Sequence, residues 1–138
     1  MVTGPPPALL AAIAARSRAF EAAYAAGDAA ALVEHYFVHD DLQPMASPPG
    51  GQPPVRGRAA LVAMFQGLIE AAPTIRLQAE AVHGDAQLAF ELGRAWLGRA
   101  DGGQALGRYT VCWRRVGPDW RAQVDFFAED GWADLAPA

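Results

Sequence analysis

Apolar side chains recur every three to four residues over three stretches of the chain, which is the period of an α-helix packed on one side. The first stretch is rich in alanine and ends at Gly27, a residue suited to the end of a helix, while Asp28 is suited to cap the next one. The third stretch ends at Pro73, which cannot continue a helix. We therefore predict helices over about residues 6–36, in two pieces, and over about residues 57–72.

Beyond residue 73 the period changes, because apolar and polar residues alternate as they do in half-exposed strands. Turns rich in glycine and aspartate separate four such stretches, at residues 74–83, 87–97, 106–116 and 120–128. Helices come first and an antiparallel meander follows, an order typical of α+β proteins. The strands are apolar on both faces and three helices cover only one, so we expect a second subunit to cover the other.

A proline-rich loop joins the second and third predicted helices, at about residues 39–55. A short strand is predicted within it, near Leu42. Because prolines have fixed backbone dihedrals, we expect the part from Pro44 to Pro54 to border the mouth of a pocket and to move little.

Several kinds of chemistry are excluded by residues that the chain lacks. It has no lysine, so neither a Schiff-base lysine nor a phosphate-loop lysine is available. Ser17 and Ser47 are its only serines, and neither lies in a Gly-x-Ser-x-Gly turn. Cys112 is the single cysteine, in a setting typical of a small buried apolar residue. A net charge of −4 and scattered arginines argue against a nucleic-acid surface.

The chain has the size of one domain, with 138 residues of which 52% are apolar. No uninterrupted apolar run approaches the ~20 residues that cross a membrane. The first residues carry no basic side chains of the kind that open a signal peptide. We therefore expect one soluble domain over residues 1–138, located in the cytoplasm and without a membrane partner.

Four stretches occur in a characteristic order: Phe20–Tyr24 with Gly27-Asp28 and Leu32, Asp40-Asp41 after Tyr36, Val55–Arg58, and Gly107–Arg115 with Trp120-Arg121. In this order and spacing the chain resembles the SnoaL-like and ketosteroid-isomerase-like branch of the nuclear transport factor 2-like superfamily. The resemblance implies an α+β fold with a cone-shaped curved sheet, antiparallel or mixed, and about three helices packed on its concave face. It also implies a deep pocket for a small apolar ligand, a homodimer through the outer sheet face, and no metal or organic cofactor.

Asp125 is the leading catalytic candidate, because it places a carboxylate directly before Phe126-Phe127 in the middle of the last predicted strand. An apolar cavity raises the pKa of a carboxylate toward neutrality, where it can accept or donate a proton. The resemblance implies the same role, since an aspartate at about this place projects into the pocket of SnoaL-like cyclases and limonene epoxide hydrolases. The alternative is a structural ion pair with an arginine such as Arg94 or Arg108.

Glu91 is a second acid within an apolar stretch, and two carboxylates in one apolar pocket push their pKa values apart. Whether Glu91 and Asp125 share a face stays open at this stage. A slip of one residue in strand register, or a single bulge, reverses which side chains point inward.

Large residues of the predicted helices and strands are the candidate walls of the pocket. Besides Glu91, the residues expected to contact a ligand are Tyr24, Tyr36, Met45, Phe65, Tyr109, Trp113 and Phe127, with Phe20 and Phe90 as further candidates. By resemblance, Tyr24 lies where the first helix of ketosteroid isomerases supplies an oxyanion donor, although core packing explains each tyrosine equally well.

His35 and His39 are spaced so that they can clamp a metal ion on one face of a helix. No third ligand is evident in the sequence. We therefore predict no metal site.

Two departures from the enzyme patterns limit what the resemblance implies. The ketosteroid isomerases place their base aspartate before a proline, where this chain reads Asp41-Leu42-Gln43-Pro44. The Arg-x-Asp of limonene epoxide hydrolases is replaced by Glu91-Leu92-Gly93-Arg94. Two hypotheses remain. One is an isomerase, cyclase or dehydratase acting by acid–base chemistry on an apolar, oxygen-bearing compound. The other is a non-catalytic ligand-binding or dimeric assembly module.

Overall fold

The computed structural model describes residues 5–48 and 52–129 of the chain. The elements are α1 (Pro7–Ala25), α2 (Ala29–Tyr36), the 3-10 turn η1 (Asp40–Leu42), β1 (Met45–Ser47), β2 (Val55–Arg56), α3 (Arg58–Ala71), β3 (Thr74–Gly84), β4 (Leu88–Gly98), β5 (Gln104–Val116) and β6 (Asp119–Glu129). The three predicted helices and the four predicted long strands are confirmed. None of the helices in this part of the chain is long and apolar enough to cross a membrane.

The helices begin and end where the sequence supplies suitable residues. Gly27 closes α1 with a φ of 72°, a left-handed conformation that glycine adopts without strain. Asp28 then caps α2 by accepting a hydrogen bond from the backbone N–H of Ala31 at 2.9 Å. The first N–H of α3, that of Arg58, is bonded by the distant Asp40 at 2.8 Å. The loop between α2 and α3 is therefore attached to the helix that follows it.

The strand predicted near Leu42 is wrong. Residues 40–42 form the 3-10 turn η1, which ends at Gln43 in a left-handed conformation with a φ of 55°. The short strand β1 follows this reversal, at Met45–Ser47, where it pairs with β6.

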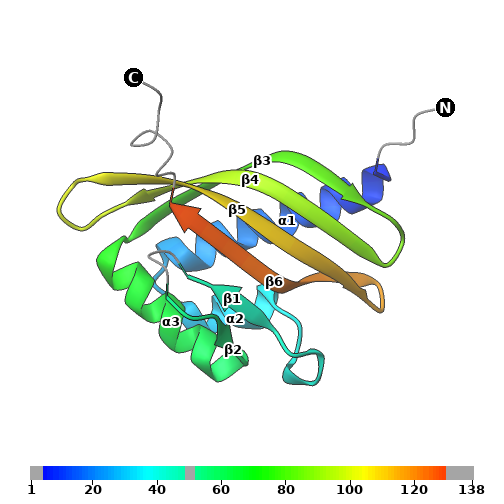
Figure 1. The fold of residues 1–138 in the computed structure, drawn as a ribbon, viewed down its shortest axis with the longest axis horizontal. Coiled ribbons are helices and arrows are strands. Elements are labelled where there is room, and N and C mark those ends of the chain that lie inside the picture. The colour runs from blue at the N-terminus through cyan, green and yellow to red at the C-terminus, as the bar shows by residue number, and fades with distance from the viewer. Residues whose placement is uncertain (1–4, 49–51, 130–138) are drawn as a thin grey trace.

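The sheet is mixed and curved, and it wraps over the three helices (Figure 1). Its strand order is β2-β1-β6-β5-β4-β3, in which β1 runs parallel to β6 and every other neighbouring pair is antiparallel. The register shifts by one residue in β3, between Ala79 and Ala81, and in β6, between Ala122 and Val124. Such bulges bend strands and increase their twist, so they help the sheet to curve around the helices.

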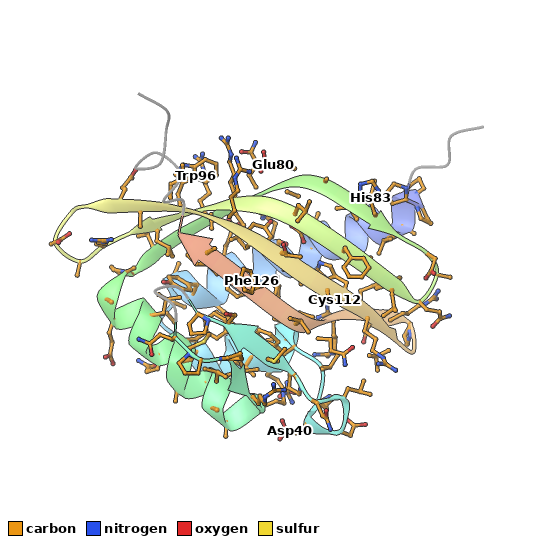
Figure 2. The ribbon with its side chains drawn as sticks, viewed as in Figure 1. Asp40, Glu80, His83, Trp96, Cys112 and Phe126 are labelled. Carbon is orange, nitrogen blue, oxygen red and sulfur yellow. The ribbon has the colours of Figure 1, made fainter. Side chains whose placement is uncertain are left out.

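The two faces of the sheet differ in what they cover. The inner face packs on α1, α2 and α3 and forms the core with them. The outer face exposes Phe90, Leu92 and Phe126, each to about half of its surface, and Figure 2 shows Phe126 on this sheet together with Cys112. Glu80 also lies on the outer face and pairs with Arg108 at 2.6 Å. The outer face is thus apolar in part, and none of α1, α2 and α3 covers it.

Three arginines close the C-terminal end of α2. Arg58 donates to the carbonyl oxygens of Val33 and Glu34, each at 3.1 Å. Arg121 donates to the same Glu34 oxygen at 2.7 Å, and Arg16 donates to the carbonyl of His35 at 2.9 Å. Positive charge at this end of a helix is favourable, because the last carbonyls have no partners within the helix. These arginines anchor the turn of α2 that ends in Tyr36.

Candidate functional site

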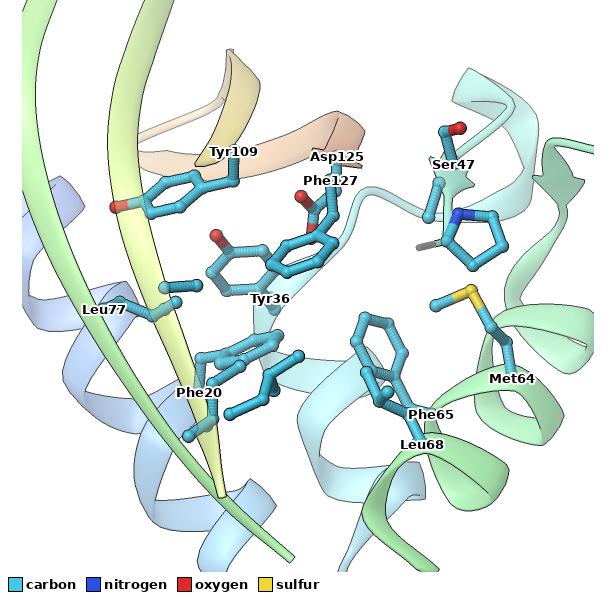
Figure 3. A pocket seen from close by; sticks show the side chains of 15 residues that line it. Phe20, Tyr36, Ser47, Met64, Phe65, Leu68, Leu77, Tyr109, Asp125 and Phe127 are labelled. Atoms are coloured by element: carbon cyan, nitrogen blue, oxygen red, sulfur yellow. The ribbon is translucent and has the colours of Figure 1, made fainter. Parts of the chain in front are cut away.

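A cavity lies between the inner face of the sheet and the helices (Figure 3). It encloses about 510 Å³ of space not filled by atoms, including its open mouth, and the centre of a water molecule can occupy about 40 Å³ of this. Its interior is therefore a narrow slot. The residues that line it are Phe20, Tyr36, Ala46, Ser47, Pro48, Met64, Phe65, Leu68, Ile75, Leu77, Ala95, Leu97, Tyr109, Asp125 and Phe127.

Asp125 enters this cavity because of the bulge in β6. Trp113 pairs with Ala122, and both face inward, whereas Cys112 pairs with Val124. Gln123 is therefore the extra residue, and beyond it the inward positions of β6 shift by one. Asp125 consequently lies opposite the inward-facing Val111 and lines the cavity.

The Asp125 carboxyl group is half-buried among apolar side chains. Within residues 5–48 and 52–129, no hydrogen bond to this carboxyl and no arginine paired with it are found. Burial, and secondarily the nearby charge of Glu91, raise the pKa of Asp125 to about 7. The carboxyl group is thus able to hold or release a proton near neutral pH.

Glu91 faces inward in the same cross-strand row as Asp125, since both pair with Val111, one from each side. Its side chain is only 1% exposed and accepts hydrogen bonds from the Tyr109 hydroxyl and, at 3.0 Å, from Trp113 Nε1. Burial raises the pKa of Glu91, against the lowering effect of these two donors. The two acids therefore share a face, the point that the sequence left open, but only Asp125 lines the cavity.

Tyr36 presents the second polar group of the cavity. Its ring packs between Phe20, at a centroid distance of 4.7 Å, and the edge of Trp113, at 5.1 Å. In Figure 3 its hydroxyl points to the space between Tyr109 and Asp125. Burial, followed by the charge of Asp125, raises the pKa of Tyr36 well above its usual value, so this hydroxyl keeps its proton.

Of the residues predicted to contact a ligand, Tyr36, Phe65, Tyr109 and Phe127 line the cavity with Asp125, as does the further candidate Phe20. The others lie elsewhere. Tyr24 is fully buried, and its hydroxyl donates to the carbonyl of Ala72 at 2.5 Å, so it ties α1 to the end of α3. Trp113 and Glu91 lie behind the cavity wall, Met45 is not among the lining residues, and Phe90 is exposed on the outer face.

Sequence reasoning missed several residues that shape the cavity. Two are glycines on inward positions of the strands, and a Cβ atom on either would overlap an aromatic ring: Tyr109 lies across Gly93, and Phe127 lies across Gly107. Glycine within a strand often marks such a close approach, so this signal was present in the sequence. Met64, on the apolar stripe of α3, also lines the cavity and was not among the residues predicted to contact a ligand.

The two histidines do not form a metal site with other ligands. His39 Nδ1 lies 2.8 Å from a guanidinium nitrogen of Arg58. In the described parts of the chain, no group of three or more histidine, cysteine, aspartate or glutamate side chains is placed to hold a metal ion.

The curved mixed sheet, wrapped over three helices around an apolar cavity, is the architecture of the nuclear transport factor 2-like class. Residues 17–123 match the model of the SnoaL-like domain, and the chain belongs to that family. No curated protein matches the chain significantly.

Solved structures share this fold at low sequence identity. A protein of unknown function with a cystatin-like fold from Nostoc punctiforme has a TM-score of 0.76 at 12% identity, covering 97% of this chain and 100% of that one. An NTF2-like protein with a cystatin-like fold from Novosphingobium aromaticivorans has a TM-score of 0.73 at 23% identity, covering 91% and 84%. A candidate dehydratase of the NTF2-like family from Streptomyces avermitilis has a TM-score of 0.70 at 18% identity, covering 91% and 98%.

Proposed function

We propose that the protein is an acid–base enzyme that acts on a small apolar compound bearing a carbonyl or hydroxyl oxygen, with Asp125 as the group that moves the proton. One observation carries the proposal: a carboxyl group with a pKa of about 7 lies in a largely apolar cavity, and none of the described residues donates a hydrogen bond to it. A structural aspartate in such a place would have a donor or an arginine partner. A group that is half-ionised near neutral pH both accepts and releases protons readily.

Tyr36 is the group proposed to bind the substrate oxygen. Its hydroxyl stays protonated, because burial raises its pKa well above the usual value, and it is therefore a hydrogen-bond donor. Ionised Asp125 takes a proton from the carbon next to a carbonyl, the electron pair of the broken C–H bond moves toward the oxygen, and Tyr36 stabilises the resulting enolate. Protonated Asp125 then returns the proton to another carbon, which completes an isomerisation, or to a leaving hydroxyl, which departs as water.

The shape of the cavity limits the size of the substrate. The centre of a water molecule reaches only about 40 Å³ of the interior, and aromatic rings form much of the wall. A flat compound with one ring fits such a slot better than a fused polycyclic one. The Streptomyces avermitilis relative, a candidate dehydratase, agrees with chemistry of this type.

Hydrogen exchange tests this proposal without knowledge of the natural substrate. Small cyclic ketones and enones are incubated with the protein in D₂O, and loss of their α-proton signals is followed by NMR. We expect the wild type to accelerate exchange and Asp125→Asn to abolish the acceleration. Asp41→Asn removes an exposed carboxylate outside the cavity and should behave like the wild type. Exchange by Asp125→Asn at the wild-type rate would contradict the proposal, and binding without exchange by the wild type would leave a ligand-binding module.

We also propose that two copies of the chain pair through the outer sheet face. Leu92, Thr110 and Phe126 form one cross-strand row there, and the exposed Phe90 lies beside it, so apolar side chains of β4 and β6 flank the small Thr110 of β5. Phe126→Glu should convert a dimer into a monomer in light scattering. Leu10→Glu changes a similarly exposed apolar residue on α1 and should leave the dimer intact. A monomeric mass for the wild type at micromolar concentration would contradict this proposal.

A further inference from the structure

Glu91 is the one acidic side chain that the described structure buries almost completely. It lies directly behind the cavity wall. Tyr109 lines the cavity with its ring and donates its hydroxyl to Glu91 on the far side, while Trp113 donates to the other carboxylate oxygen. Both donors lie on β5, one two residues before Val111 and the other two residues after it, and Val111 is the cross-strand partner of Glu91. Both oxygens of this carboxylate are therefore bonded.

These two hydrogen bonds hold one residue of the cavity wall, Tyr109, and one residue behind the wall, Trp113. The Tyr109 ring lies next to Gly93, where any side chain would overlap it. Trp113 packs with its ring at 69° to that of Tyr36, at a centroid distance of 5.1 Å. Through one donor Glu91 fixes a wall of the cavity, and through the other it fixes the neighbour of the proposed oxygen-binding tyrosine.

We propose that Glu91 is a positioning residue of the Asp125 site, which holds Tyr109 and Trp113 from behind the cavity wall and presents a negative charge to Asp125 across Val111. The inference rests on the proposed function, because it assigns Glu91 a role in supporting the same acid. Glu91 does not line the cavity and acts through other residues.

The groups that face Asp125 come from three elements: Tyr36 on α2, Tyr109 on β5 and Glu91 on β4. The cavity-lining parts of α1, α3, β1 and β3 contribute no titratable group. Both tyrosines stay neutral, because burial raises the pKa of each. Glu91, which Arg18 of α1 faces in turn, accepts two hydrogen bonds that favour its charged form, and its charge is one of the causes that raise the pKa of Asp125.

Glu91→Gln is the direct test, because glutamine keeps the shape and removes the charge. Its amide oxygen accepts from Trp113 and its NH₂ group donates to the Tyr109 oxygen, so the packing is conserved. The pKa of Asp125 is read from the pH dependence of its carboxyl ¹³C signal, assigned by its loss in Asp125→Asn. Two inter-strand spacings, across β5, separate the acids by ~10 Å, so at an effective dielectric constant of ~20 the pKa of Asp125 should fall by about one pH unit.

A purely structural role for Glu91 gives a different result. The melting temperature of Glu91→Gln would then fall while the Asp125 titration stayed in place, and that outcome overturns the inference. Glu80→Gln is the matched control, because Glu80 lies on the outer face and pairs with Arg94 and Arg108. It should leave the Asp125 titration unchanged.

A second variant decides the question if Glu91→Gln does not fold. Tyr109→Phe keeps the ring in the cavity wall and removes one donor to Glu91, which raises the pKa of Glu91 and weakens its charge near neutral pH. The pKa of Asp125 should then fall as well, and an unchanged titration overturns the inference. The NMR titration needs no substrate. If exchange activity survives in Asp125→Asn, the proposed function fails, and the titration still reports whether Glu91 acts on Asp125.

Discussion

Replacing Asp125 by asparagine should make the protein more stable at pH 8, although it removes the proposed catalytic group. The unfolded chain ionises this aspartate near its ordinary pKa of ~3.9, whereas the folded protein holds the proton until about pH 7. Between these values the folded state binds more protons than the unfolded state, so the free energy of unfolding falls as the pH rises. Above about pH 7 both states are ionised and the loss is complete.

The size of this loss follows from the difference between the two pKa values. A difference of about three pH units corresponds to ~4 kcal/mol at ~1.4 kcal/mol per unit. Because the carboxyl group is partly exposed to the cavity, we take about 2–4 kcal/mol as the expected range. Asparagine has a similar shape and does not ionise. The stability of Asp125→Asn relative to the wild type should therefore rise by this amount from pH 4 to pH 8.

Urea unfolding measured at intervals from pH 4 to pH 8 tests the prediction for the wild type, Asp125→Asn and the exposed-site control Asp41→Asn. Burial also raises the pKa of Glu91, so its contribution to the free energy of unfolding falls as the pH rises. Glu91 is present in all three proteins and therefore contributes to every curve. Parallel curves for the wild type and Asp125→Asn would refute the reasoning, because they would mean that the carboxyl group is not desolvated. A loss of several kcal/mol in Asp125→Asn at every pH would instead indicate a structural ion pair.

Other predictions concern the residues that shape and support the cavity. Gly93→Ala should cost roughly 1–3 kcal/mol in urea unfolding, because its Cβ overlaps the Tyr109 ring. Gly67→Ala, inside α3 with no atom within 4 Å of the added Cβ, should gain about 0.5–1 kcal/mol in the same measurement. Arg58→Ala should cost roughly 2 kcal/mol, since it removes two hydrogen bonds from a charged donor to the carbonyls at the end of α2, and a change below ~0.5 kcal/mol would contradict the anchoring role of Arg58.

Periodicity predicted the helices and the long strands, and the family resemblance added the curvature of the sheet. The helical stripes and the alternation beyond residue 73 each reflect burial against one surface, so the elements can be recognised without tertiary information. The strand placed near Leu42 failed for a local reason, since a left-handed Gln43 ends a 3-10 turn there. Such a conformation at a residue other than glycine or asparagine leaves no clear signal in a sequence.

The candidate site was predictable in part. Asp125 was chosen for its apolar neighbours, yet strict alternation continued from Trp120 and Ala122 would point Val124 inward and Asp125 outward. Tyr24 was expected at the cavity because of its place in the first helix. Its hydroxyl instead meets a carbonyl at the end of α3, and that contact depends on how the two helices pack.

The extra residue in β6 separates the position of an acid in the sequence from the side of the sheet on which it lies. Deletion of Gln123 would remove the bulge and leave Ala122, Val124 and Asp125 opposite Trp113, Cys112 and Val111, so the carboxylate would stay in the cavity. A relative whose last strand is regular would therefore carry its inward acid two residues after the counterpart of Ala122 instead of three. When relatives are aligned, a gap opposite Gln123 thus preserves the chemistry of the cavity, whereas an ungapped alignment would compare the wrong residues.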